Sequence, residues 1–115
     1  MAVRTEDRLG STALVGTTYI SLGQASASDT WNVIVQLVNV TTANILARAY
    51  VASSGWVSGA PSATTLIQTV AFDVAIGSTP VHITGIIVKP NERIVVRSDT
   101  TASLDATAAG VKRAA

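Results

Sequence analysis

Hydrophobic and polar residues alternate with a period of two along most of this chain, which is the pattern of β-strands. The clearest case is the segment 30–40, where four apolar residues share one face: Trp31, Val33, Val35 and Leu37. The opposite face of this segment is also partly apolar, as expected for a strand that is covered on much of both faces. We therefore predict a central strand whose four-residue row lines the protein interior.

The same alternation predicts further strands over 45–52, 66–74, 81–88 and 93–98, with weaker candidates at 19–22 and 103–107. In the predicted strand 66–74, the residues expected to face the core are Leu66, Val70, Phe72 and Val74. The polar cluster 39–44 is predicted to turn a hairpin, and Pro90 falls in the turn between two later strands, where its fixed φ is useful. About seven or eight strands at short spacings, without helical patterns between them, indicate an all-β sandwich or barrel.

The two ends and one long loop lack this alternation. Residues 1–10 are charged, and residues 110–115 form a short polar tail, so neither is expected to be a core strand. We therefore divide the chain into an extended N-terminal arm, 1–10, and a β-sandwich domain, 11–115, which includes the C-terminal tail. The loop 53–62 contains Trp56, an aromatic that is either a partner-binding anchor or folded back over the sandwich edge. The predicted partner-binding residues are Arg4, Glu6, Asp7, Arg8 and Trp56.

Composition narrows the possible partners. The 115 residues fit one domain; 48% are hydrophobic and only 13% charged, with a formal net charge of +1. Because no basic stripe is present, we expect no nucleic-acid ligand. Without a signal peptide or an apolar run near the roughly 20 residues of a membrane span, we expect a soluble chain with no membrane partner. The mean hydropathy of +0.42 predicts apolar surface that is covered in a homo-oligomer, with a trimer favoured.

Candidate chemistry is sparse. There is no cysteine, and the single histidine, His82, lies in a β-type run without a nearby histidine or a carboxylate at ligand spacing. Asp99 and Asp105 are a weak candidate cation site, and Arg93 and Arg97 share one face of their strand as a solvated or interface face. We therefore predict no catalytic, cofactor-binding or metal-binding residues, no small-molecule substrate, and no enzymatic activity.

Three segments carry a resemblance to a known group of proteins: 14–22, which contains Thr18-Tyr19; 31–39, which ends Val38-Asn39; and 84–98, which begins Thr84-Gly85. Together they resemble the small β-sandwich virion proteins of tailed bacteriophages, with Pro90-Asn91 at a turn where glycine is common. The resemblance implies a single antiparallel β-sandwich of jelly-roll type, in which 84–98 is a hairpin.

The resemblance also implies a non-enzymatic virion structural protein, assembled in the host cytoplasm. Our first expectation is a capsid decoration (cement) protein that binds the major capsid protein on the outer surface of the phage head as an oligomer. One alternative is a neck-fibre, head-fibre, tail or baseplate accessory protein that binds other virion proteins. A second alternative, from a different class, is a carbohydrate-binding adhesin module, which would use an exposed aromatic such as Trp56.

Overall fold

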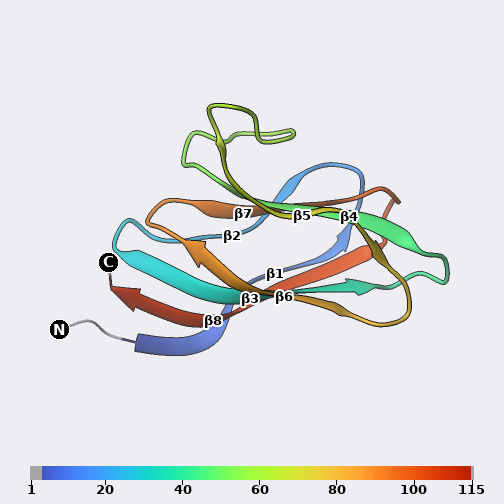
Figure 1. Cartoon of the computed structure of the whole chain (residues 1–115), viewed down its shortest axis with the longest axis horizontal. Coiled ribbons are helices and arrows are strands. Elements are labelled where there is room, and N and C mark those ends of the chain that lie inside the picture. Colours follow the sequence, from blue (N-terminus) through green and yellow to red (C-terminus); the bar gives the residue numbers. More distant parts are fainter. Residues whose placement is uncertain (1–3, 115) are drawn as a thin grey trace.

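Two four-stranded antiparallel sheets pack face to face and enclose the apolar rows of their strands (Figure 1). The computed structural model describes the backbone of residues 4–114 and the side chains of residues 9–114. The first sheet has the order β1-β8-β3-β6 and the second β2-β7-β4-β5. The strands are β1 (Arg4–Val15), β2 (Ile20–Gln24), β3 (Asp29–Asn39), β4 (Ile45–Ala52), β5 (Leu66–Ile76), β6 (Val81–Val88), β7 (Arg93–Ser98) and β8 (Leu104–Ala114). The predicted all-β sandwich of jelly-roll type is confirmed.

The core is formed by the inward rows of the central strands. Trp31, Val33, Val35 and Leu37 of β3 are all at most 4% exposed, so the predicted interior row is confirmed. Small alanines complete the core: Ala47 and Ala49 on β4 of the other sheet, and Ala106 and Ala108 on β8, beside the β3 row in the same sheet. Small side chains beside large ones, Trp31 among them, fill the space between the two sheets.

The connections differ from the sequence prediction in one respect. Strands β3 and β4 lie in different sheets, and so do β6 and β7, so neither 39–44 nor 89–92 turns a hairpin. At 89–92 the backbone N–H of Glu92 donates to the carbonyl of Lys89 (3.0 Å), and Asn91 has φ +67°. This is the geometry of a type II turn, whose third residue needs positive φ. Within residues 4–114, β4 and β5 are the one pair of consecutive strands that share a sheet.

A β-bulge reverses part of the predicted inward row of β5. Ala47 pairs with Val74 and Ala49 with Ala71, so Phe72 and Asp73 together oppose one residue of β4. Asp73 takes a positive φ of 51°, and the bulge turns Phe72 outward, where it is 60% exposed. The expectation that Phe72 faces the core is therefore wrong, because an inserted residue shifts the alternation by one position.

The predicted N-terminal arm is a strand over its described part. Residues 4–8 pair with residues 109–113 of β8, and the expected boundary after residue 10 falls inside β1. Residues 110–114 of the predicted polar tail also belong to the sheet, because β8 is a central strand that pairs with β3 on its other side. β8 thus supplies the backbone hydrogen-bond partners of residues 4–8. Residues 1–3 of the predicted arm and residue 115 of the predicted tail lie outside the described residues. The described residues hold no helix that is long and apolar enough to cross a membrane.

Candidate interaction surface

Arginine and aromatic side chains gather on the outer face of the β2-β7-β4-β5 sheet. The guanidinium carbon of Arg48 lies 4.4 Å from the ring centre of Phe72, and that of Arg97 lies 5.6 Å from the ring of Tyr19. The Arg97 Nε also donates to the carbonyl of Thr17 (2.8 Å). Such cation–π contacts each stabilise by roughly 0.5–1 kcal/mol at exposed sites. They hold these arginines against the sheet, on the side of β7 that the sequence predicted to be a solvated or interface face.

The loop 53–65, between β4 and β5, rises above this face of the sandwich (Figure 1). Its ends are joined where the N–H of Ser53 donates to the carbonyl of Thr65 (2.8 Å). Trp56 packs on Ala52 and Val95, and its indole N–H donates to the carbonyl of Gly59 (2.8 Å). These contacts bury both faces of the last residues of β4.

Of the two interpretations left open for Trp56, the structure shows the one in which the loop folds back. The side chain is only 7% exposed, and the guanidinium of Arg93 lies 5.6 Å from its ring. A sugar-stacking platform needs an exposed ring face, so this indole does not provide one in the structure described here.

At the bulge of β5, one ion pair neutralises the face. The Arg48 Nε lies 2.7 Å from Asp73 Oδ1, and its Nη2 donates to Oδ2 (3.1 Å). The hydrogen bonds from Arg48 lower the pKa of the Asp73 carboxyl. The Asp73 carboxylate in turn raises the pKa of the Arg48 guanidinium further above its usual value. On the same strand as Arg48, burial raises the pKa of Tyr50, whose ring centre lies 6.0 Å from that of Tyr19.

The structure does not bring the predicted partner-binding residues together. Arg4, Glu6, Asp7 and Arg8 lie along β1 at the margin of the first sheet, whereas Trp56 packs on the outer face of the second. Their side chains are outside the described ones, so only their backbone positions in the ladder with β8 are known.

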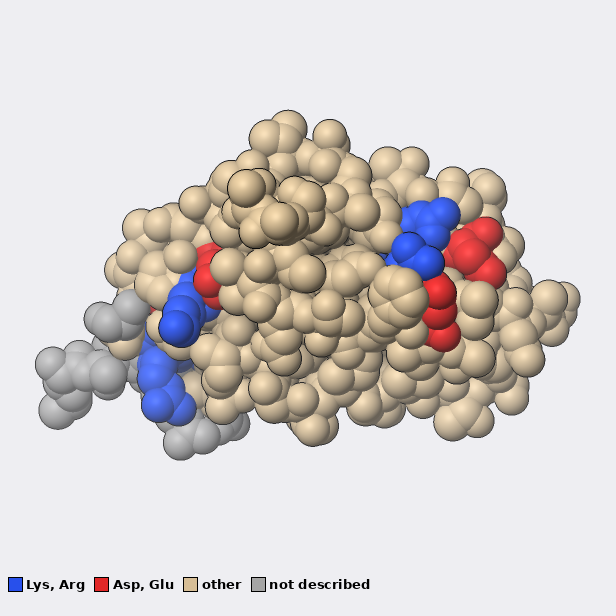
Figure 2. Space-filling view, turned by 45° about the horizontal axis from the view of Figure 1, so that its top comes forward, with Lys and Arg blue, Asp and Glu red and all other residues tan. Residues whose placement is uncertain are grey.

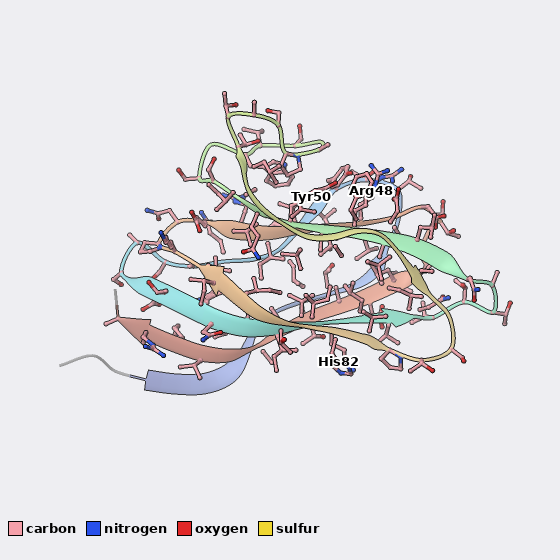
Figure 3. The ribbon with its side chains drawn as sticks, in the orientation of Figure 1. Arg48, Tyr50 and His82 are labelled. Carbon is pink, nitrogen blue, oxygen red and sulfur yellow. The ribbon has the colours of Figure 1, made fainter. Side chains whose placement is uncertain are left out.

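The other candidate residues are separated from one another. His82 is exposed on β6, at the side of the molecule away from Arg48 and Tyr50 (Figure 3). Asp99 accepts the N–H of Leu46 (3.0 Å), which lowers the pKa of its carboxyl, and Asp105 accepts the N–H of Leu14 (2.9 Å). Among the described residues there is no group of three or more potential metal ligands and no pocket.

Sequence reasoning missed the most extended feature of the surface. Of the fifteen charged residues, the segment 49–88 contains one, Asp73, whose charge is neutralised by Arg48. We call 49–88 the neutral segment; it includes the loop 53–65 and the edge strands β5 and β6. Figure 2 shows the charged residues in two separate groups on the visible face, with an uncharged expanse between them. A plot of charge along the chain would have revealed this segment.

The neutral segment also carries exposed apolar side chains. Among the described residues, nine large hydrophobic side chains are exposed, and five of these belong to the neutral segment: Val57, Leu66, Ile67, Phe72 and Ile87. Exposed apolar side chains in a segment that lacks free charges are typical of a surface that meets a partner.

Comparison with known proteins identifies the fold. No known protein family matches this chain, and no curated protein does. Among solved structures, a chain in the structure of infectious bursal disease virus, Gx strain, matches with a TM-score of 0.51 and 13% sequence identity. The match covers 99% of this chain and 33% of the viral chain. The fold is a jelly-roll-like β-sandwich. This chain thus spans about a third of the length of its viral neighbour, which does not come from a tailed phage.

Proposed function

We propose that this chain is a virion structural protein, and specifically a decoration protein on the outer surface of a tailed-phage head. The observation that carries the proposal is the strand order, β1-β8-β3-β6 packed on β2-β7-β4-β5, in a fold shared with a viral chain. Eight-stranded jelly rolls of this kind recur in viral capsid domains. The bacteriophage part of the proposal is supported by the sequence segments 14–22, 31–39 and 84–98.

In this proposal the product of the fold is a surface, and the chain catalyses no reaction. Its supporting feature is the neutral segment, whose five exposed apolar side chains are suited to macromolecular contact. The chain would be assembled onto the particle in the host cytoplasm, with the major capsid protein or another virion protein as partner.

The charged margin of the first sheet is the proposed particle-facing element. β1 is an edge strand, so one side of its backbone is unpaired along Arg4–Val15. An extended segment of a capsid protein could add to this edge by backbone hydrogen bonds, with the charges at positions 4, 6, 7 and 8 setting the register. A neck, fibre or tail location would use the same edge on a different virion protein.

The test is sedimentation of the purified chain with capsids and, separately, with tails of the virus whose genome encodes it. We expect the chain to sediment with capsids. Binding to tails alone would favour the accessory-protein alternative, and binding to neither particle would overturn the proposal.

A charge variant tests the particle-facing element. Arg8→Glu should weaken particle binding by about tenfold, because a reversed charge at an interface opposes the partner's complementary charge. Lys89→Glu is the matched control, since it makes the same charge change in an exposed turn. Charge variants are preferable to deletion of residues 1–8, because deletion would also remove the ladder with β8. Equal binding by both variants would exclude β1 as the contact.

A further inference from the structure

The first residues of β5 are exposed on both faces of the strand. Leu66 is 40% and Ile67 51% exposed, and the next two residues, Gln68 and Thr69, are also exposed. Adjacent residues of a strand point to opposite faces, so Leu66 and Ile67 present apolar surface on both sides of the sheet margin. Because β5 is also an edge strand, a third side, the backbone edge, is open as well.

The first part of the β5 edge lacks the charged residues that usually protect an edge strand from pairing with another chain. Lysines, other charges and prolines usually protect a long edge, yet residues 66–72 contain none of them. Bulges provide some protection here: the pairing with β4 shifts register between Val51 and Ala52, between Ala49 and Tyr50, and at Phe72–Asp73. An irregular edge is a poor template for a long added ladder, so a partner would make contact here mainly through side chains.

The charge distribution indicates which partner fits. A charged partner gains nothing from a surface whose one charge is already paired with Arg48, at 2.7 Å. When copies of a chain assemble around a symmetry axis, equivalent surfaces near the axis meet, and any net charge there repels its equivalent. The neutral segment avoids this repulsion, whereas fourteen of the fifteen charged residues lie outside it.

We propose that the Leu66–Thr69 edge of β5 is the contact between copies of this chain, with equivalent edges meeting near the symmetry axis of a homo-oligomer. The contact does not depend on the proposed virion role, since it forms between purified chains in the absence of particles. It assigns the copy-to-copy contact to the neutral segment and leaves the charged margin at β1 open for a different partner.

The first test is the molar mass in solution, measured by sedimentation velocity across the micromolar range. We expect the chain to be an oligomer and Ile67→Glu to raise its dissociation constant at least about a hundredfold, because the variant places like charges near the axis. Ile34→Glu is the matched control: Ile34 is 44% exposed on β3 of the other sheet, and the substitution is identical. We expect it to leave the mass unchanged.

Two results would contradict the proposed contact. A wild-type chain that is monomeric throughout this range would overturn the proposal. So would dissociation by Ile34→Glu with Ile67→Glu unaffected, since the contact would then lie on the outer face of the first sheet. Circular dichroism of both variants separates dissociation from unfolding.

Single-cysteine cross-linking tests the same contact without disturbing its apolar side chains. The chain has no cysteine, so each variant contains one thiol. Thr69→Cys should form disulfide-linked dimers on mild oxidation, and Ser11→Cys, an exposed hydroxyl residue on the opposite edge strand β1, should not. Cross-linking of Ser11→Cys with none at Thr69→Cys would place the contact at the other margin and refute the proposal.

Discussion

The inner strand pairs of this sandwich differ from the outer pairs in the regularity of their register. β3 and β8 are joined by eleven consecutive residue pairs and β4 and β7 by six, with no shift in either ladder. The four pairs that include an edge strand, β1–β8, β2–β7, β3–β6 and β4–β5, each contain at least one register shift. Regular pairing is thus confined to the centre of each sheet.

The difference follows from burial. A central strand contributes one face to the sandwich core, and a slip of one residue would bring its polar face inward, so its register is strongly specified. An edge strand can accommodate an extra residue with its side chain in solvent, as Phe72 and Asp73 do. The proposed contacts therefore lie on the edge strands β1 and β5, where the fold tolerates variation.

The largest expected effect is in the central pair. Leu37→Ala should lower the free energy of unfolding by about 2–5 kcal/mol, because Leu37 is fully buried and its truncation leaves a cavity. Val35→Ala should also destabilise the protein. Ile34→Ala, on the exposed face of β3, should change the free energy of unfolding by no more than about 0.5 kcal/mol. The measurement is denaturant unfolding at one fixed protein concentration; similar values for Leu37→Ala and Ile34→Ala would contradict the contrast between the two faces.

A smaller effect is expected at Gly110 of β8, which pairs with Val33 of β3. A Cβ on Gly110 would lie 2.9 Å from the Cα of Val33 and would overlap the carbonyl oxygen of Asn32. Gly110→Ala should therefore push the two central strands apart and lower the free energy of unfolding by about 1–3 kcal/mol.

Gly16→Ala is the control for this substitution. The added Cβ would be 3.4 Å from the nearest atom, an ordinary contact, so the expected cost is less than about 1 kcal/mol. The melting temperatures of the two variants are compared by thermal unfolding. Equal values would show that a methyl group fits between β3 and β8 at Gly110.

The smallest effect is expected at the edge, as a pH dependence. Arg48 lowers the pKa of Asp73, so the folded state favours the ionised carboxyl more than the unfolded state does. This contribution to stability is present above the ordinary aspartate pKa of 3.8 and is lost as the pH falls through the lowered folded value.

A carboxyl-detected NMR titration should place the midpoint of Asp73 below 3.8 in the wild type. In Arg48→Gln the midpoint should move up towards that value, because the guanidinium that stabilises the carboxylate is gone. An unchanged midpoint would show that the ion pair does not persist in solution.

The sequence by itself determined most strand positions and the interior row of β3. Both follow from the local alternation of apolar and polar residues, because successive side chains of a strand point to opposite faces and the inward ones must be apolar. The segments predicted at 81–88 and 93–98 correspond to β6 and β7. The candidate interaction surface was harder to predict from the sequence. The alternation indicated the face that carries Arg97, but it did not indicate the exposed edge of β5.

Tertiary structure alone decided which strands pair, and with that the character of the surface. Alternation does not tell whether a turn returns to its own sheet or crosses to the other, so β3–β4 and β6–β7 resembled hairpins although each connects two sheets. The charged residues 4–8 became a strand because β8 supplied hydrogen-bond partners about a hundred residues away in sequence. Trp56 became buried because its loop closes over β4 and β7. Each of these outcomes depends on contacts between distant segments, which no local pattern of residues contains.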